Sequence, residues 1–133
     1  MKKNGILNSD ISRVLSYMGH TDTLAIVDCG FPIPPAVECI DLSVKFGMPL
    51  FLDVLKEVIN DFEVEAAILA NEIKGNNPVV LSEALSLFNE EEVQFVSHDM
   101  FKKLVTSSKA IIRTGEATPY ANIILRSGCT FKV

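Results

Sequence analysis

Two histidines and an aspartate are the side chains of this chain best suited to move or hold protons. His20 and Asp28 bracket the apolar run 23–27, and His98 follows a second strand-like segment. Histidine exchanges protons near neutral pH, and a carboxylate can orient an imidazole or hold a hydroxyl group. If His20 and Asp28 both face a crevice beside that run, they would support general acid–base catalysis on a small ligand.

Each of these histidines also has a purely structural interpretation. His20 follows Gly19, where a helix is expected to stop, and the helix dipole favours a histidine at that end. Ser97, His98 and Asp99 would also serve as the start of a helix. The pattern alone leaves the structural and the chemical interpretations open.

A second cluster of polar side chains lies near the C-terminus. Arg113, Glu116, Tyr120 and Asn122 together offer hydrogen-bond donors and acceptors without a metal or an apolar pocket. This set suits a small polyhydroxylated ligand, whose hydroxyl groups must each be matched to offset the water they lose. The alternative is a tight turn followed by an edge strand with solvated polar ends.

Other chemistries find little support in the residue pattern. No histidine, cysteine or carboxylate pair has the spacing of a metal motif, and no glycine-rich phosphate loop of the usual patterns occurs. Cys29 beside Asp28 could be a nucleophile, although a small residue under a tight loop explains it better. The net charge of −5 argues against nucleic acid, and no apolar run is long enough to cross a bilayer. The three cysteines are odd in number and widely spaced, which favours reduced thiols in the cytoplasm.

The surrounding pattern predicts strands that alternate with helices in a single domain of residues 1–133. Strands are expected over residues 23–27, 37–42, 64–70, 92–96, 109–113 and 122–126. Helices are expected after a cap at Ser9 until Gly19 as the C′ residue, after Pro49 at the N1 position, after Pro78, and around 101–105. This alternation predicts a mostly parallel sheet covered on both faces.

The expected strand ends carry polar side chains. Asp28, Glu72, His98 and Glu116 each fall just beyond the end of a strand. In an open α/β sheet, the carboxyl ends of the strands form the edge at which ligands bind. We therefore expect the site at this edge of the sheet.

Three stretches resemble the D-ribose pyranase family of sugar mutarotases. They are GILNSDISRVLSYMGHTD (5–22), DCGFPIP (28–34) and IRTGEATPYANIIL (112–125), and the resemblance covers essentially the whole chain. The usual loop of that family is DAGLPIP, so Cys29 and Phe31 depart from it, and neither is expected to do chemistry.

The resemblance implies a three-layer α/β/α fold with a mostly parallel central sheet. It also implies interconversion of the pyranose and furanose forms of D-ribose without a cofactor or a metal, with His20 as the proton donor. The implied sugar contacts are Asp28, His98, Tyr120, Ala121 and Asn122. By the same resemblance the chains form a homodecamer of stacked pentamers whose pockets are completed by a neighbouring subunit. The cysteine spacing, the net charge and the lack of a long apolar run add the expectation of a cytoplasmic protein with no nucleic-acid or membrane partner.

The chemistry of ring opening fits these residue types. A proton leaves the anomeric hydroxyl, another reaches the ring oxygen, and acid–base help of this kind contributes roughly 10²–10⁴-fold. In this hypothesis His20 shuttles the proton, Asp28 and Asn122 hold hydroxyl groups, and His98 either binds sugar or transfers the complementary proton. Two alternatives remain: a non-catalytic ribose-binding accessory of a transport system, and a mutarotase for another sugar such as fucose.

Overall fold

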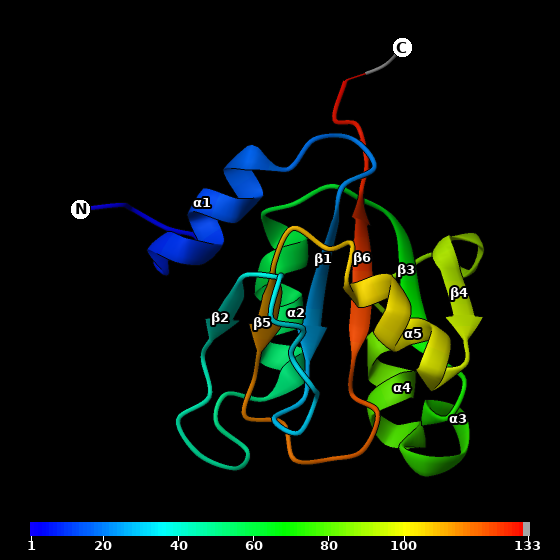
Figure 1. Ribbon diagram of the computed structural model, residues 1–133. Coiled ribbons are helices and arrows are strands. Elements are labelled where there is room, and N and C mark those ends of the chain that lie inside the picture. The colour runs from blue at the N-terminus through cyan, green and yellow to red at the C-terminus, as the bar shows by residue number, and fades with distance from the viewer. Residues whose placement is uncertain (132–133) are drawn as a thin grey trace.

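The computed structural model describes residues 1–131, which fold around a six-stranded sheet in the order β2-β5-β1-β6-β3-β4 (Figure 1). The strands are β1 (Thr23–Val27), β2 (Cys39–Asp41), β3 (Val64–Ala70), β4 (Val93–Val96), β5 (Ile111–Arg113) and β6 (Ile123–Ser127). β6 runs antiparallel to its neighbours β1 and β3, and the other neighbouring pairs are parallel. The predicted mostly parallel sheet is confirmed, with one antiparallel strand inserted near its middle.

Helices cover both faces of this sheet, which confirms the three-layer α/β/α arrangement. The helices are α1 (Ser9–Tyr17), α2 (Phe51–Asn60), α3 (Ile73–Asn76), α4 (Pro78–Leu85) and α5 (His98–Val105), with a 3-10 turn at Glu90–Glu92. In Figure 1, α5 lies in front of the sheet and α2 behind it. Within residues 1–131, no helix combines the length and the apolar character that crossing a bilayer would need.

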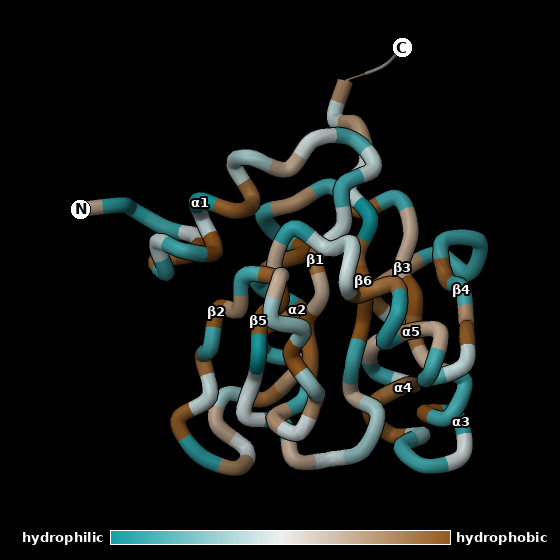
Figure 2. The backbone as a smooth tube through the Cα atoms, in the orientation of Figure 1, coloured by the Kyte–Doolittle hydropathy of each residue, from teal (hydrophilic) through white to brown (hydrophobic). Residues whose placement is uncertain are grey.

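The alternation of side chains along β1 divides the core in two. Leu24 and Ile26 point into the larger apolar cluster, which also contains buried residues of α1 to α4, and both are fully buried. Ala25 and Val27 point to the opposite face, where Phe31 and Phe101 complete a smaller cluster. This is the period of two that a strand imposes. Figure 2 shows hydrophobic stretches along β1 and β3 and in α2, which lies behind β1.

The N-cap of the first helix lies one residue earlier than expected. Asn8 is the N-cap, because its Oδ1 accepts the backbone N–H of Ile11 at 2.9 Å, whereas Ser9 is the first helical residue. Gly19 follows the C-cap and so occupies the expected C′ position. The left-handed residue of the turn into β1 is Thr21, with φ of 74°.

The start of α2 differs from the prediction more strongly. Pro49 is not the N1 residue, because Leu50 is the N-cap and the helix begins at Phe51. The N–H of Phe51 donates to Oε1 of Glu116 at 3.1 Å, so the cap comes from a loop 65 residues further along the chain. Pro78 does begin α4, as expected, whereas the short α3 before it was not predicted.

Candidate active site

One edge of the sheet collects polar side chains because of strand direction. β1 and β4 run in the same direction, because β6 is antiparallel to both β1 and β3 and because β3 is parallel to β4. The residues that follow these two strands, Asp28 and His98, therefore lie at the same edge. β6 runs the other way, so it begins at this edge and brings the preceding residues Tyr120 and Asn122 to it. Three segments far apart in sequence therefore meet here.

These segments enclose a cavity of about 250 Å³, which we call the rim pocket. Its lining residues are Asp28, Gly30, Phe31, Pro32, His98, Pro119, Tyr120 and Asn122. A carboxylate, an imidazole, a phenol and a carboxamide thus line one small space, a set that can match several hydroxyl groups of one ligand. The rim pocket combines four of the six residues expected from the sequence.

Ala121 lies at the same edge of the sheet as the rim pocket, but its side chain points into the core and not into the pocket. It is fully buried and belongs to the larger apolar cluster on the far face of the sheet. Its neighbour Asn122 is also almost fully buried, with 1% of its surface exposed. A contact between Ala121 and a ligand would therefore have to come from its backbone.

Asp28 and Asn122 are fixed to each other at the floor of the rim pocket. The backbone N–H of Asp28 donates to Oδ1 of Asn122 at 2.8 Å, and the N–H of Gly30 donates to Oδ1 of Asp28 at 3.0 Å. Burial raises the pKa of Asp28, and hydrogen bonds from Gly30 and Asn122 together with the nearby His98 only partly oppose this shift. The result is a half-buried carboxylate with little freedom of orientation.

We expect Asp28→Asn to raise the free energy of unfolding at pH 7 although it removes a residue of the site. The raised pKa means that the folded state holds the carboxyl proton more tightly than the unfolded state, so ionisation of Asp28 lowers stability as pH rises through that interval. Below about pH 4 the carboxyl is protonated in both states and the advantage of the variant disappears. Urea denaturation of both proteins at pH 7 and in acid measures this, and an advantage that persisted in acid would contradict it.

His98 is both a helix start and a wall of the rim pocket, so the two interpretations of its sequence context are compatible. It is the first residue of α5, and its backbone N–H donates to the two carboxylate oxygens of Glu72 at 2.9 and 3.1 Å. Its ring lies edge-on to Phe31 and Tyr120, with centroids 6.1 and 5.1 Å away, and stacks on Phe101 at 6.4 Å. Among the described residues its buried Nδ1 has no hydrogen-bond partner.

Tyr120 has a backbone conformation that a non-glycine residue rarely adopts. Its φ is 56°, in the left-handed region. Such conformations persist where the surrounding structure enforces them, and they cluster at functional sites. Here the conformation accompanies the short turn in which the N–H of Asn122 donates to the carbonyl of Tyr120 at 2.9 Å.

Arg113 and Glu116 support the loops of the site. Arg113 donates to the carbonyl oxygen of Cys29 at 2.8 Å and to Oδ2 of Asp41 at 3.0 Å. Glu116 is 5% exposed and accepts hydrogen bonds from α2 and from Thr118. The expectation that these two side chains join Tyr120 and Asn122 in one ligand-binding set is therefore corrected, because their polar atoms are already engaged.

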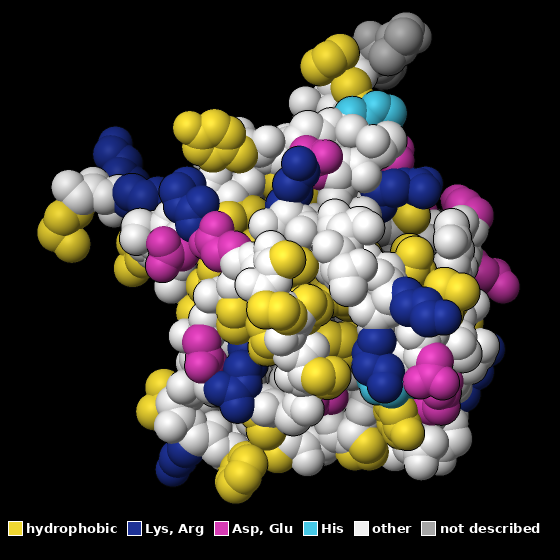
Figure 3. Space-filling model, in the orientation of Figure 1, with side chains coloured by type: hydrophobic (Ala, Val, Ile, Leu, Met, Phe, Trp, Pro, Cys, Tyr) yellow, Lys and Arg dark blue, Asp and Glu magenta, His cyan; other side chains and the backbone are white. Residues whose placement is uncertain are grey.

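His20 precedes β1 and Asp28 follows it, and the five residues of that strand span about 16 Å. The expectation that both face one crevice is wrong for a single chain, because the residues before and after a strand lie at opposite edges of the sheet. Histidine surface is accordingly seen near the top of the molecule and again, partly covered, in its lower part (Figure 3).

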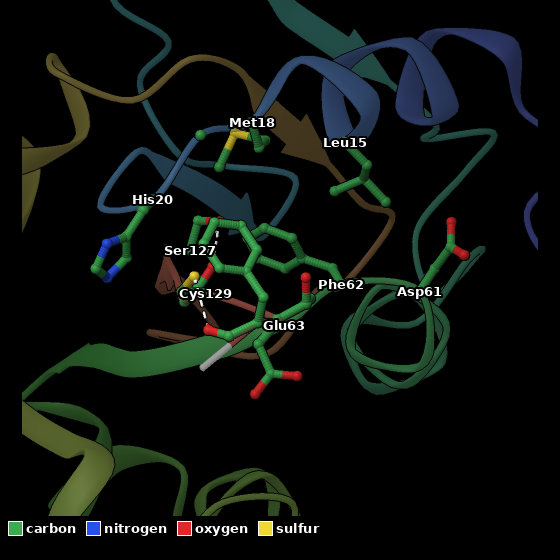
Figure 4. A pocket seen from close by; sticks show the side chains of 12 residues that line it. Leu15, Met18, His20, Asp61, Phe62, Glu63, Ser127 and Cys129 are labelled. Carbon is green, nitrogen blue, oxygen red and sulfur yellow. Dashed lines mark hydrogen bonds between the residues drawn. The ribbon is translucent and has the colours of Figure 1, made fainter. Parts of the chain in front are cut away.

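The surroundings of His20 are a separate hollow of about 350 Å³ beside the carboxyl end of β6 (Figure 4). Met18, Glu63 and Cys129 are among its lining residues. The His20 side chain is 56% exposed, and its Nε2 lies 2.9 Å from Oε2 of Glu65. The sequence pattern did not point to Glu65, nor to Phe31 as a wall of the rim pocket.

The chain matches one family along nearly its entire length. Residues 1–130 match the sequence model of the RbsD / FucU transport protein family. The D-ribose pyranase of Laribacter hongkongensis (strain HLHK9) is 53% identical to this chain over 98% of the chain and 100% of the relative. The D-ribose pyranase of Halalkalibacterium halodurans is also 53% identical, over the same shares of both proteins.

Solved structures show the same similarity in three dimensions. The structure of Bacillus subtilis RbsD complexed with D-ribose superposes with a TM-score of 0.95 at 46% identity, covering 98% of this chain and 100% of that one. A fucose mutarotase from Streptococcus pneumoniae, in complex with L-fucose, has a TM-score of 0.82 over 94% and 95% of the two chains. At 19% identity this second match speaks for the fold alone.

Proposed function

The chain belongs to the RbsD / FucU transport protein family, and from this membership we propose that it is a sugar mutarotase that interconverts the pyranose and furanose forms of D-ribose. The observation that carries the proposal is the rim pocket, in a fold that matches a ribose-bound protein at a TM-score of 0.95. The activity is that of an isomerase, and the relatives at 51–53% identity are named for it.

We assign the sugar to the rim pocket. The Asp28 carboxylate accepts hydrogen bonds from sugar hydroxyl groups, and the side-chain amide of Asn122 donates to sugar oxygens because its Oδ1 is already used by the chain. Tyr120 and His98 contribute a phenol and an imidazole to the lining of the same pocket. Aromatic rings beside these polar groups suit the mixed polar and apolar faces of a monosaccharide.

The proton donor in this proposal is His20 of a neighbouring copy of the chain. Within one chain His20 and the rim pocket lie at opposite edges of the sheet, whereas its side chain is more than half exposed and free to face another copy. The sugar ring opens when the anomeric hydroxyl loses its proton, the bond from the anomeric carbon to the ring oxygen breaks and the ring oxygen gains a proton. The resulting aldehyde then closes on the other hydroxyl, so that no atom or electron is gained or lost.

An exposed apolar loop beside the rim pocket supports association of copies. Val44, Phe46 and Met48 are 74%, 83% and 48% exposed, and Phe46 lines a hollow of about 290 Å³ that shares Asp28 with the rim pocket. Exposed apolar patches of this kind mark contact surfaces between proteins. We propose a closed homo-oligomer, a decamer of stacked pentamers, in the cytoplasm. The three cysteines, free among the described residues, agree with that compartment.

Ring-form exchange under equilibrium conditions tests the activity directly. Magnetisation transfer between the pyranose and furanose signals of D-ribose is expected to accelerate on adding the protein, and L-fucose is expected to respond less. The alternatives make different predictions: an accessory that only binds ribose would leave exchange at its spontaneous rate, and a fucose enzyme would reverse the order of the two sugars. The similarity to D-ribose pyranases at 51–53% identity favours neither alternative.

A further inference from the structure

A carboxylate and a guanidinium follow His20 in a linear chain of hydrogen bonds. Nε2 of His20 lies 2.9 Å from Oε2 of Glu65, and the other oxygen, Oε1, accepts from Nε of Arg126 at 2.8 Å. The three residues come from the turn before β1, from β3 and from β6. Each oxygen of the carboxylate thus has a separate partner.

The strand that carries Glu65 is irregular at that residue. Val64 pairs with Ser127 and Ala66 pairs with Arg126, so the ladder between β3 and β6 skips Glu65, as in a β-bulge. Bulges re-aim a side chain and are common next to active sites. Gly128 leaves room for Glu65 at the bulge, because a Cβ at position 128 would lie only 3.3 Å from the Cβ of Glu65. The backbone therefore holds Glu65 in the direction of His20.

The charge state of Glu65 decides which ring nitrogen of a neutral His20 carries the proton and which one lacks it. Hydrogen bonding from His20 lowers the pKa of Glu65, and Arg126 adds to this shift, so the group is an ionised carboxylate at neutral pH. An ionised carboxylate only accepts hydrogen bonds, so the nitrogen facing it must carry the proton. That nitrogen is Nε2, which leaves Nδ1 as the atom able to exchange a proton with a ligand.

We propose that Glu65 is a positioning residue that fixes the tautomer and the ring orientation of His20, with Arg126 anchoring the carboxylate, so that Nδ1 is the atom that exchanges a proton with the sugar. The proposal rests on the proposed mutarotase activity and on His20 as its proton donor. Glu65 does not touch the sugar, and it acts only through the imidazole. A comparable arrangement, in which a carboxylate holds an imidazole in its working tautomer, occurs in hydrolytic triads.

The tautomer of His20 can be measured in the wild-type protein, without any variant. Long-range proton–nitrogen correlation spectra of the imidazole, recorded on the wild-type protein above the titration range of the ring, are expected to show the Nε2–H form. Glu65→Gln is expected to show a mixture of both forms, because a carboxamide can donate as well as accept. Predominance of the Nδ1–H form in the wild type would overturn the proposal.

Exchange kinetics supply the second readout. Glu65→Gln is expected to lower kcat for ribose ring-form exchange about tenfold or more with KM changed less than about twofold, since a lost orienting carboxylate affects the reacting state and not sugar binding. Glu63→Gln is the matched control, a carboxylate in the hollow beside His20 that has no hydrogen bond to that ring among the described residues. It is expected to keep the wild-type kcat and tautomer.

The outcomes separate this proposal from the activity on which it rests. A wild-type kcat in Glu65→Gln, or an equal loss in Glu63→Gln, would overturn the positioning role while leaving the mutarotase intact. A wild-type protein that does not accelerate exchange at all would overturn the activity, and the tautomer would still report whether Glu65 fixes the ring. Because Glu65 is one-third exposed, its replacement is not expected to prevent folding.

Discussion

Ring-form exchange in His20→Ala is expected to fall to near the spontaneous rate, a loss of about 10²–10⁴-fold relative to the wild type. The reason is chemical: the rim pocket retains its hydrogen-bonding groups, but the group that we propose to deliver a proton to the ring oxygen is gone. Saturation transfer between the pyranose and furanose signals of D-ribose measures the rate in both proteins at equal concentration. Among the described contacts the imidazole pairs only with Glu65, so the free energy of unfolding should change by less than about 0.5 kcal/mol.

Sugar binding is the control for this variant. Because Asp28, His98 and Asn122 are unchanged, chemical-shift changes on adding ribose should persist in His20→Ala with about the wild-type midpoint. Loss of binding together with loss of exchange would mean that His20 holds the sugar. An unchanged exchange rate would mean that His20 has only a structural role and that the proton comes from another group, of which His98 is the one in the rim pocket.

Most of the fold was predictable because its signals are local. The apolar runs of β1 and β3 were expected with the same bounds as the structure gives, 23–27 and 64–70. The caps of α1 and α2 were not, and the second shows why: Glu116 caps Phe51 from 65 residues away. A hydrogen bond between residues so far apart leaves no signal in the sequence around the helix. The local sequence therefore favoured Pro49 as the first helical residue instead.

The sequence predicted only the part of the candidate site that forms the rim pocket. Strand direction places the residues after parallel strands at one edge, and Asp28 and His98 follow from that rule. The same rule should have excluded His20, which precedes its strand, from the same edge. Glu65 carries no local signal either, since a bulge is a property of the pairing between β3 and β6 and not of either sequence alone.

The separation of His20 from the rim pocket leads to a prediction about assembly. His20→Ala removes the proposed proton donor, and Asp28→Asn replaces the proposed acceptor of sugar hydroxyl groups, so each variant is expected to lower exchange by itself. Part of the activity is expected to return when both chains are expressed together. If each site takes His20 from one chain and Asp28 from another, a random mixture of equal amounts has about one quarter of its sites intact. A site built within one chain would leave none intact. The structure favours the first outcome, since the five residues of β1 separate the two side chains in one chain.

A converse mixture makes the test quantitative and guards against unequal expression. The double variant His20→Ala/Asp28→Asn, expressed with an equal amount of wild type, leaves about one quarter of shared sites intact but about one half of sites that lie within one chain. Shared sites therefore predict the same activity in the two mixtures, whereas sites within one chain predict none in the first and half in the second. Neither side chain belongs to the apolar clusters that hold the chain together, so both variants are expected to enter the assembly. Equality of the two mixtures is thus a signature of shared sites that a general loss of folding or a difference in protein amount cannot imitate.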